Sequence, residues 1–334
     1  MLKLKLLGTG TYLPELILTN EMLSQIVETN DEWITSRTGI TERRLSSGEP
    51  TWHMAVRAAE KALAASGLAA NDLDLIVATS VTPDYFFPSV SSIVQDEIGA
   101  ANAFCFDLNA ACTGFVYAVD LAARYLNTGD IRNVLVVSAE NVSKLTDYTD
   151  RATCVLFGDG ASAAVFSAGS PDDESCLLAS HLGTKGEGGK YLVSQALKIN
   201  HPFIENDQVW PDRFGHDKGH NLTMEGNEVY KFAVNAMTES IKAATEKAGI
   251  KLAQIKYIIP HQANSRIVDA SARRLKVKSA QMISRVSDFG NTSSASIPIC
   301  LDEIIRDDRL KRGDLIAICG FGAGLTYGAA ILRY

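Results

Sequence analysis

Cys112 is a cysteine that the sequence places at the turn between a strand and a helix. The residues before it, 104–108, are typical of a strand, and the apolar periodicity after it predicts a helix over 113–127. A thiol at a helix N-terminus feels the positive end of the helix dipole and unpaired N–H groups, which favour the thiolate. Small residues on both sides, Ala110 and Gly114, would leave room for a substrate carbonyl. Cys112 is therefore a candidate nucleophile in an elbow-like turn.

Five further cysteines have a plainer interpretation as core residues. Most unpaired cysteines behave as small buried hydrophobes, and each of these lies in or beside an apolar strand or helix. They are Cys105, Cys154, Cys176, Cys300 and Cys319. The same interpretation stays open for Cys112, because its position and neighbours alone do not decide between a nucleophile and a core thiol. Since there is no C-x-x-C pair and no regular spacing, we expect reduced thiols in a cytoplasmic protein.

His261 and Asn291 are candidate partners of Cys112. His261 follows an apolar strand over 257–260, at the end where open α/β sheets place their sites, although it could simply be a structural histidine. Asn291 lies in a glycine turn that leads into a helix, where Asn is also a common N-cap. Through a ring N–H and a side-chain amide, the two neutral groups could donate hydrogen bonds to one oxygen. We therefore expect the three side chains to meet in one central pocket.

The elements that position these residues occur twice, in the same order. Residues 67–77 match residues 249–259, because in both segments a Gly closes an Ala-rich helix and a polar link leads into an apolar strand. The later matches are Gly129-Asp130 with Gly313-Asp314, and Phe157-Gly-Asp-Gly160 with Phe321-Gly-Ala-Gly324. Chance similarity between two generic α/β segments is the alternative explanation. If the chain is duplicated, Cys112 and Asn291 lie at the starts of corresponding helices, which a pseudo-twofold axis relates.

The repeat predicts an α/β protein with two similar halves. The N-terminal half, 1–175, carries the cysteine, and the C-terminal half, 176–334, carries the histidine and the asparagine. Apolar runs such as 75–78 and 134–137 are typical of central strands that helices cover on both faces. Those helices are expected at about 53–66, 113–127, 227–248, 264–275 and 293–306. Residues 181–221 hold six glycines and four of the six histidines without clear periodicity, which predicts a long irregular segment.

Composition and charge argue against several classes of protein. The chain has 334 residues, 46% hydrophobic and 21% charged, as in an ordinary globular enzyme. Its net charge of −7 argues against general nucleic-acid binding, which needs an excess of Lys and Arg. Residues 1–8 alternate with period two, which predicts a strand and not a signal peptide, and no run approaches the roughly 20 apolar residues of a membrane span. Neither a strand-linked Gly-x-Gly-x-x-Gly motif nor a metal-spaced histidine pair is present.

Seven short motifs occur in order along the chain. They are Thr29-Asn-Asp-Glu-Trp-Ile-Thr-Ser-Arg-Thr-Gly-Ile40, Ala110-Ala-Cys-Thr-Gly114, Asp150-Arg-Ala-Thr153, Phe157-Gly-Asp-Gly160, Glu225-Gly-Asn-Glu-Val229, Pro260-His-Gln-Ala-Asn264 and Gly290-Asn-Thr-Ser293. Together they resemble the thiolase superfamily, and specifically the β-ketoacyl-acyl-carrier-protein synthase III family. The resemblance covers nearly the whole chain and implies a duplicated, thiolase-like α/β fold with five layers, αβαβα. The internal repeat points to the same fold independently.

The resemblance implies an enzyme that initiates fatty-acid synthesis in two steps. Cys112 would take an acyl group from acyl-CoA, while its own N–H and that of Ala323 hold the oxyanion. Malonyl-acyl carrier protein would then bind and lose CO₂. His261 and Asn291 would stabilise the enolate, which attacks the Cys112 thioester and gives a 3-oxoacyl-acyl carrier protein. Such a reaction needs no metal or redox cofactor, since CoA enters as part of a substrate.

The family's CoA-binding residues have counterparts in this chain. Trp33 and Arg151 would flank the CoA adenine by stacking, and Arg37 and Asn264 would lie along the same tunnel. The residues implied to contact the acidic carrier protein are Gln262, Ala263, Asn264, Ser265, Arg266 and Lys231. We therefore expect acyl carrier protein and acyl-CoA as partners, with no nucleic acid and no membrane.

Two phenylalanines complete the resemblance. Phe157 would border the acyl pocket, and Phe87 would reach across a homodimer to close the partner's pocket, unless it is plain core. The resemblance does not identify the acyl primer, because acetyl, branched and longer groups differ by pocket volume and not by motif. The segment 181–221 borders the expected substrate entrance, so it adds to this uncertainty about the primer.

Three other functions stay open at this stage. A ketosynthase or acyltransferase of specialised metabolism would share the fold and differ in its product. A cysteine hydrolase with a Cys–His pair would release a free acid, although no residue in the sequence obviously orients His261. A CoA-binding protein without activity would bind stoichiometrically and give no reason for Cys112, His261 and Asn291 to coincide.

Overall fold

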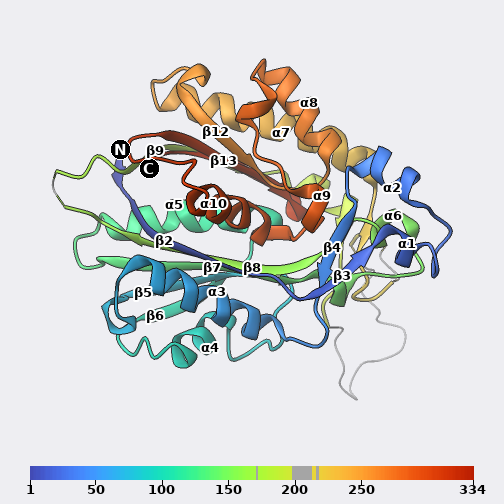
Figure 1. Ribbon diagram of the computed structural model, residues 1–334, viewed down its shortest axis with the longest axis horizontal. Helices are drawn as coiled ribbons and strands as arrows, with labels where there is room; N and C mark the ends of the chain where they lie inside the picture. The colour runs from blue at the N-terminus through green and yellow to red at the C-terminus, as the bar shows by residue number, and fades with distance from the viewer. Residues whose placement is uncertain (171, 198–212, 216–217) are drawn as a thin grey trace.

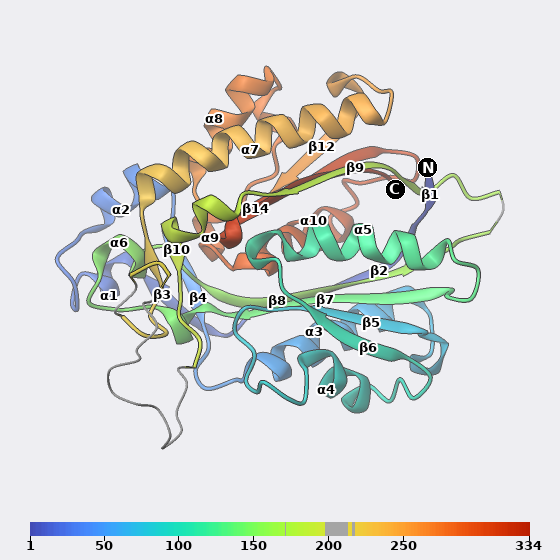
Figure 2. The same ribbon diagram turned by 180° about the vertical axis from the view of Figure 1, so that it is seen from behind.

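Two five-stranded sheets lie face to face in the computed structural model, which describes residues 1–170, 172–197, 213–215 and 218–334 (Figures 1 and 2). The first sheet has the order β2-β8-β7-β5-β6. Its strands are β2 (Lys5–Tyr12), β5 (Leu75–Thr79), β6 (Phe104–Leu108), β7 (Asn133–Asn141) and β8 (Asp159–Ser167). β5 runs parallel to both β6 and β7, and it is buried along its whole length, as its apolar run predicted.

The second sheet repeats this arrangement, with the order β1-β9-β14-β13-β12. Its strands are β1 (Leu2–Lys3), β9 (Cys176–Thr184), β12 (Ile255–Pro260), β13 (Leu315–Gly322) and β14 (Thr326–Arg333). A parallel pair, β12 with β13, is followed by the antiparallel pairs β13 with β14 and β14 with β9. This is the pattern of β5, β7, β8 and β2 in the first sheet, which supports the predicted duplication.

Helices form the remaining three layers, and the predicted five-layer αβαβα fold is confirmed (Figures 1 and 2). The outer layers are α3 (Thr51–Ser66) with α4 (Val90–Glu97), and α7 (Gly226–Lys247) with α8 (Ser265–Leu275); the central layer is α5 (Gly114–Leu126) with α10 (Ser296–Arg306). The central helices are covered by sheets on both sides, so apolar residues surround them, as a fully buried helix requires. The five predicted helices are all present to within a turn.

The central core joins the two halves. Phe115 of α5 and Ile297 of α10 are fully buried in one cluster with residues from both sheets. Burying such a side chain contributes roughly 1.5–3 kcal/mol of hydrophobic free energy. Because both helices begin at the same end of the molecule, this packing brings the two helix starts together in space, which is where the candidate residues lie.

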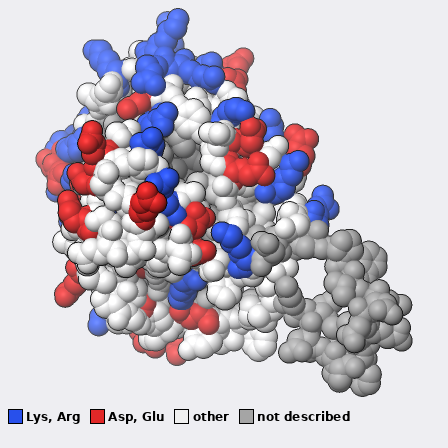
Figure 3. All heavy atoms as spheres, turned by 90° about the vertical axis from the view of Figure 1, so that its right-hand side faces the viewer, with Lys and Arg blue, Asp and Glu red and all other residues white. Residues whose placement is uncertain are grey.

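Short elements cover that end of the molecule. They are α1 (Asn20–Leu23), α2 (Asp31–Thr38), α6 (Arg151–Cys154) and α9 (Val286–Phe289), with the paired strands β3 (Leu16–Thr19) and β4 (Glu42–Leu45), and β10 (Leu192–Val193) and β11 (Thr223–Met224). Arg43 of β4 joins β3, α1 and the end of α6. Its fully buried side chain donates to the Leu18 carbonyl, to Asn20 Oδ1 and to the Val155 carbonyl. Their outer surface is the face seen in Figure 3.

The prediction of an irregular segment over 181–221 is wrong at its start. Strand β9 continues to Thr184, because the whole strand pairs with β14, although its mixed small and polar residues carry no clear period. Residues 186–191 then form a 3₁₀ turn. Residues 198–212 and 216–217 of the predicted segment lie outside the described residues. Within the described part of the chain, no helix has both the length and the apolar composition of a membrane span.

Candidate active site

A cavity of about 1490 Å³ receives residues from both halves of the fold, at the end where α5 and α10 begin. Cys112, His261 and Asn291 all line it, so the structure brings together the three side chains predicted to meet there. Phe157 and Ala323 line the same cavity. The apolar walls and these few polar groups give it the character of a small-molecule site.

Cys112 lies in a tight turn immediately before α5. Residues 111–113 form a 3₁₀ turn, and Ala111 has a φ of 47°, in the left-handed region that few residues with a side chain adopt. Strand β13 approaches this turn so closely that a Cβ atom on Gly322 would be 2.7 Å from the Cys112 backbone nitrogen. Glycine at position 322 therefore lets the second sheet pack directly against the nucleophile turn.

The thiol of Cys112 is not the ready thiolate that its position at a helix start suggested. Burial raises the pKa of Cys112 to about 12, because the cavity floor withholds the water that would solvate a thiolate. The Ser293 hydroxyl opposes this rise, because it could donate to a thiolate, and the negative charge of Glu140 adds to it. Cys112 therefore carries its proton at neutral pH, and a reaction at its sulfur must remove that proton.

Asn291 lies in the matching turn of the second half. Residues 293–295 form a 3₁₀ turn before α10, and Ser293 has a φ of 50°, like Ala111 in the first half. Matching the two turns residue by residue pairs Ala111 with Ser293 and therefore Cys112 with Ser294. The counterpart of Cys112 is thus Ser294, and Asn291 lies three residues before it. Asn291 Oδ1 accepts from the Ser293 N–H at 2.9 Å, which leaves the side-chain NH₂ as the group that can donate into the cavity.

His261 is nearly inaccessible, with 1% of its surface exposed, and it follows the last residue of β12. Its Nδ1 atom lies 2.7 Å from Ser296 Oγ. The same oxygen accepts a hydrogen bond from the Gln262 N–H at 3.2 Å. Within the described residues, Nδ1 is the acceptor available to the Ser296 hydroxyl proton, so the ring proton belongs on Nε2. Burial lowers the pKa of His261 to about 3, which keeps the ring neutral. His261 is therefore placed to donate one hydrogen bond from Nε2.

Ser296 is a site residue that the sequence analysis missed, since it found no partner to orient His261. Ser296 ends the glycine-turn segment that contains Asn291, but nothing local in the sequence indicated its contact with His261. Ser296 is the first residue of α10, and its hydroxyl contacts His261, which follows β12 and lies 35 positions earlier in the sequence.

We expect Ser296→Ala to slow the step that depends on His261 and to spare the chemistry at Cys112. Without its hydroxyl partner the imidazole can adopt either tautomer, so the fraction with a proton on Nε2 falls. Loss of such an orienting partner typically costs roughly one to two powers of ten in rate. Steady-state kinetics should show a fall in kcat with little change in KM, and Ser296→Thr, which keeps the hydroxyl, should retain most of the rate. Equal kcat values for Ser296→Ala and wild type would contradict this role.

An aromatic and cationic cluster lies at the cavity wall formed by α2. The guanidinium carbons of Arg37 and Arg151 lie 4.6 and 4.7 Å from the centre of the Trp33 ring. Asn264 donates to the Arg37 carbonyl at 3.2 Å and caps α8 through the Arg266 N–H. Trp33, Arg37 and Asn264 line the cavity, whereas Arg151 reaches the cluster from α6. The four residues predicted to lie along one tunnel are therefore neighbours in space.

The residues predicted to contact a carrier protein do not share one surface. Arg266 is exposed and lines the cavity beside Ala263, while Ser265 is half-buried. Gln262 is 3% exposed, because its amide donates to two backbone carbonyls and accepts from the Arg285 N–H, so a direct contact with a partner is excluded for this side chain. Lys231 pairs with Glu228 and borders a separate hollow. Lys and Arg side chains nevertheless gather over the upper part of the face in Figure 3, where α7 and α8 lie.

Phe87 points away from the cavity of its own chain. It is 86% exposed and is absent from the cavity lining, whereas its neighbour Phe86, 73% exposed, lines it. The alternative that Phe87 belongs to the core is therefore wrong. Exposed aromatic residues in sequence are typical of a contact surface.

Comparison with known proteins places this site in a family. A model of the 3-oxoacyl-[acyl-carrier-protein] synthase III family matches residues 106–186, and a model of its C-terminal part matches residues 245–334. The chain is 46% identical over 334 residues to the β-ketoacyl-[acyl-carrier-protein] synthase III of Clostridium novyi (strain NT), covering 100% of both chains.

Solved structures agree with this result. The 3-oxoacyl-[acyl-carrier-protein] synthase III from Aquifex aeolicus VF5 superposes with a TM-score of 0.90 at 41% identity, covering 99% of this chain and 100% of that one. The priming β-ketosynthase of the R1128 polyketide pathway superposes with a TM-score of 0.87 at 34% identity, covering 99% and 96%. The chain therefore belongs to the 3-oxoacyl-[acyl-carrier-protein] synthase III family.

Proposed function

We propose that this chain is a β-ketoacyl-acyl-carrier-protein synthase III, which condenses an acyl-CoA primer with malonyl-acyl carrier protein at the start of fatty-acid synthesis. The observation that carries the proposal is the meeting of Cys112, His261 and Asn291 in one cavity, with the Trp33 cluster on its wall. Family membership at 46% identity over the full chain supports the same reaction.

The first half-reaction forms an acyl-enzyme. Cys112 Sγ attacks the thioester carbonyl of acyl-CoA, and the backbone N–H groups of Cys112 and Ala323 hold the oxyanion. The tight turn at Ala111 and the close approach of Gly322 support this assignment, because they keep the two backbone segments adjacent and rigid.

The second half-reaction forms the carbon–carbon bond. Malonyl-acyl carrier protein loses CO₂, and His261 Nε2 and the Asn291 amide donate hydrogen bonds to the enolate oxygen. The enolate then attacks the Cys112 thioester. A neutral His261 suits this role, since a donor that keeps its proton stabilises the enolate without quenching it.

Acyl-CoA enters the cavity along the wall formed by α2, which carries Trp33 and Arg37. The indole and the two guanidiniums offer stacking surfaces for the CoA adenine and positive charge for its phosphates. Arg266, exposed at the cavity, is the residue of the predicted carrier-binding stretch that could pair with an acidic carrier protein. We further propose that the enzyme is cytoplasmic, consistent with six free cysteines, and that its halves divide between residues 175 and 176, just before β9.

The identity of the products tests the proposal. A panel of acetyl-, branched and longer acyl-CoA primers should be incubated with malonyl-acyl carrier protein, and the products should be weighed by mass spectrometry. We expect 3-oxoacyl-acyl carrier protein from at least one primer. Release of free acid without malonyl substrate would instead identify a cysteine hydrolase, for which the Ser296–His261 contact would also serve. Condensation with malonyl-CoA alone would point to a ketosynthase of specialised metabolism.

We also propose a homodimer in which Phe87 enters the partner's acyl pocket, as its exposure allows. Phe87→Ala should weaken dimerisation at least about fivefold, because truncating a buried interface aromatic costs at least about 1 kcal/mol. Sedimentation velocity over a range of concentrations measures this. Ile26→Ala is a matched control, since Ile26 is an apolar residue that is also exposed, at 59%, and it should leave the dimer intact. A wild-type chain that sediments as a monomer at micromolar concentration would rule the interface out.

A further inference from the structure

Glu140 is a buried carboxyl group beside the cavity that the proposed reaction leaves unused. It lies on β7 with no exposed surface. One oxygen, Oε2, accepts from the Val81 N–H at 3.0 Å and from Thr82 Oγ1 at 3.1 Å. The other, Oε1, accepts from Ser294 Oγ at 2.6 Å and from Ser293 Oγ at 3.0 Å. Its desolvation raises the pKa of Glu140, so this carboxyl group can hold a proton more readily than an exposed one.

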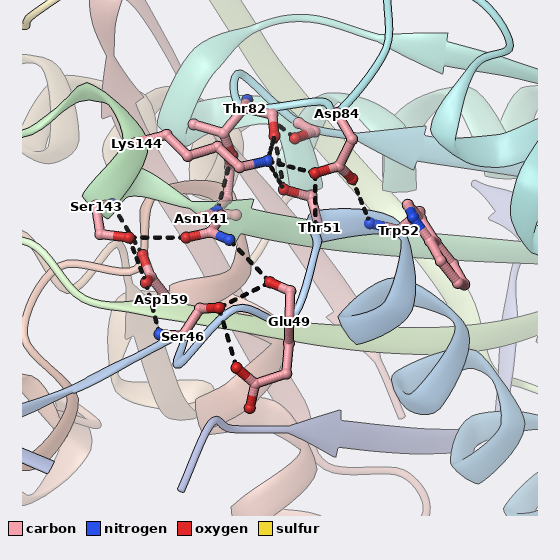
Figure 4. Close-up of polar contacts among 12 residues, drawn as sticks. Ser46, Glu49, Thr51, Trp52, Thr82, Asp84, Asn141, Ser143, Lys144 and Asp159 are labelled. Carbon is pink, nitrogen blue, oxygen red and sulfur yellow. Dashed lines mark hydrogen bonds and ion pairs between the residues drawn. The ribbon is translucent and has the colours of Figure 1, made fainter. Parts of the chain in front are cut away.

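Thr82, which lines the same cavity, fixes the position of Glu140. Thr82 Oγ1 accepts from the Asn141 N–H at 2.8 Å while it donates to Glu140. The Thr82 carbonyl accepts from Lys144 Nζ at 3.3 Å (Figure 4). Lys144 is thus the cation that faces Glu140 through Thr82, and its ammonium is paired with Asp84. Among the described residues, none of the hydrogen-bond partners of Glu140 is a cation.

Ser293 connects Glu140 to the sulfur of Cys112. Its hydroxyl oxygen lies 3.4 Å from Cys112 Sγ and 3.0 Å from Glu140 Oε1. A hydroxyl has one proton to donate, and a carboxylate is a stronger acceptor than a thiol sulfur. Ser293 therefore donates to Glu140 and can accept from the Cys112 S–H. Two consecutive hydrogen bonds, from the Cys112 S–H to Ser293 Oγ and from the Ser293 hydroxyl to Glu140 Oε1, therefore connect the sulfur to the carboxylate.

The acylation step needs such a connection. Burial keeps the proton on the Cys112 thiol, so an acceptor must take it when the sulfur attacks. His261 is poorly suited, because Ser296 occupies its Nδ1 atom and Nε2 already carries a proton. Within the described residues, Glu140 is the carboxyl group that a single hydroxyl links to the sulfur.

We propose that Glu140, acting through Ser293, takes up the thiol proton of Cys112 during acylation and returns it when condensation releases the thiolate. The proposal deepens the proposed function and rests on it. In the first step a bond forms between Sγ and the acyl carbon, and the bond from that carbon to the CoA sulfur breaks. The thiol proton moves to Ser293 Oγ while the hydroxyl proton of Ser293 moves to Glu140 Oε1. CoA leaves as a thiolate and takes a proton from water.

The second step restores the starting state. The malonyl carboxylate leaves as CO₂, and its electron pair forms the enolate that attacks the acyl carbon. The bond from that carbon to Sγ then breaks and yields the Cys112 thiolate. Glu140 returns its proton to Ser293, and Ser293 passes its own proton to Sγ. In the first step the negative charge of Glu140 therefore passes to the departing CoA thiolate and from it to the solvent, and in the second step the charge of the malonyl carboxylate passes to Glu140.

The test compares Glu140→Gln and Ser293→Ala with wild type in single-turnover acylation of Cys112 by an accepted acyl-CoA, followed by mass. Loss of a positioned base typically costs 10²–10⁴-fold, so we expect both variants to acylate about 10²-fold more slowly at pH 7. The deficit should shrink as the pH rises towards 10, because hydroxide then removes the thiol proton directly. Glu140→Asp, which keeps a carboxylate, should recover part of the rate.

Asp159→Asn is the matched control for the loss of a buried carboxylate. Asp159 is also fully buried and accepts from the Ser46 and Ser143 N–H groups, at 2.9 Å each, in the cluster of Figure 4, away from Cys112. It should keep the wild-type rate and pH profile of acylation. A folded Glu140→Gln protein that acylates like wild type overturns the proposal, as does an equal slowing in Asp159→Asn. If Glu140→Gln does not fold, Ser293→Ala decides, since Glu140 keeps its other three partners in that variant.

Alkylation of Cys112 by iodoacetamide separates this proposal from the proposed function. The reagent needs the thiolate and no CoA or carrier protein, so it reports the proton transfer alone. The same slowing of alkylation in Glu140→Gln and Ser293→Ala, in a protein that no acyl-CoA acylates, would sustain the relay and reject the condensing function. Equal alkylation rates in all variants would reject the relay whatever the substrates prove to be.

Discussion

Cys112→Ala will abolish the acyl-enzyme and with it the condensation of acyl-CoA with malonyl-acyl carrier protein. The side chain removed is the one that lies in the strained turn before α5 and faces the cavity. Removing a nucleophile that forms a covalent intermediate typically lowers kcat by at least about 10⁴-fold, because the remaining groups cannot supply an alternative path of comparable barrier. Intact-protein mass spectrometry after incubation with radiolabelled or unlabelled acetyl-CoA measures the intermediate, and product mass measures condensation.

Cys105→Ala is the matched control for this experiment. Cys105 is also partly accessible, but it lies on β6 with its sulfur 3.7 Å from Ser92 Oγ, outside the cavity. We expect this variant to acylate and condense like wild type. A stable acyl adduct on the Cys112→Ala protein would mean that another side chain is the nucleophile, and the assignment of Cys112 would fall.

His261→Ala should separate the two half-reactions. His261 has no contact with the thiol proton in our account, so acylation of Cys112 should continue within a few-fold of the wild-type rate. Decarboxylation of malonyl-acyl carrier protein should fall by about 10²–10³-fold, which is the typical cost of removing one preorganised donor to an oxyanion. Acyl-enzyme formation is followed by mass and decarboxylation by release of CO₂ from labelled malonate. Decarboxylation at the wild-type rate would remove His261 from the second step.

The pH dependence of this step carries an independent signature. Because burial lowers the pKa of His261 to about 3, the ring stays neutral from pH 9 down to about pH 4. The decarboxylation rate of wild type should therefore show no inflection near pH 6.5, where an exposed histidine titrates, and only protonation near pH 3 would change the donor. His53→Ala, which changes a histidine on α3 outside the cavity, should give the same profile and rate as wild type.

Much of the fold could be predicted because its signals are local. The five predicted helices and the strands around 75–79 and 134–138 follow from apolar periodicity and from glycines at turns, which depend on neighbouring residues. Strand β9 could not be found in this way, because its mixed residues are extended by pairing with β14, about 150 positions later in the chain. The short helix α4 was missed too, since it covers the edge of a sheet and has few apolar residues.

The candidate residues could be found from sequence, but their chemistry could not. The turn before α5 identified Cys112, yet the expected thiolate was wrong, because burial in the assembled cavity outweighs the local effect of the helix start. Ser296 and Glu140 carried no local signal for their partners. Each meets its partner only when two distant turns pack together, and a side-chain contact between positions far apart leaves no periodic trace.

The sequence by itself therefore determined most of the elements, the duplication and the identity of Cys112, His261 and Asn291 as a set, because repeated short motifs encode repeated local structures. The tertiary structure decided what those residues can do. Stacking of two sheets around α5 and α10 placed the two helix starts at one cavity, and burial of the side chains there set the protonation of Cys112 and His261. Desolvation depends on every group that surrounds a site, and those groups come from both halves of the chain.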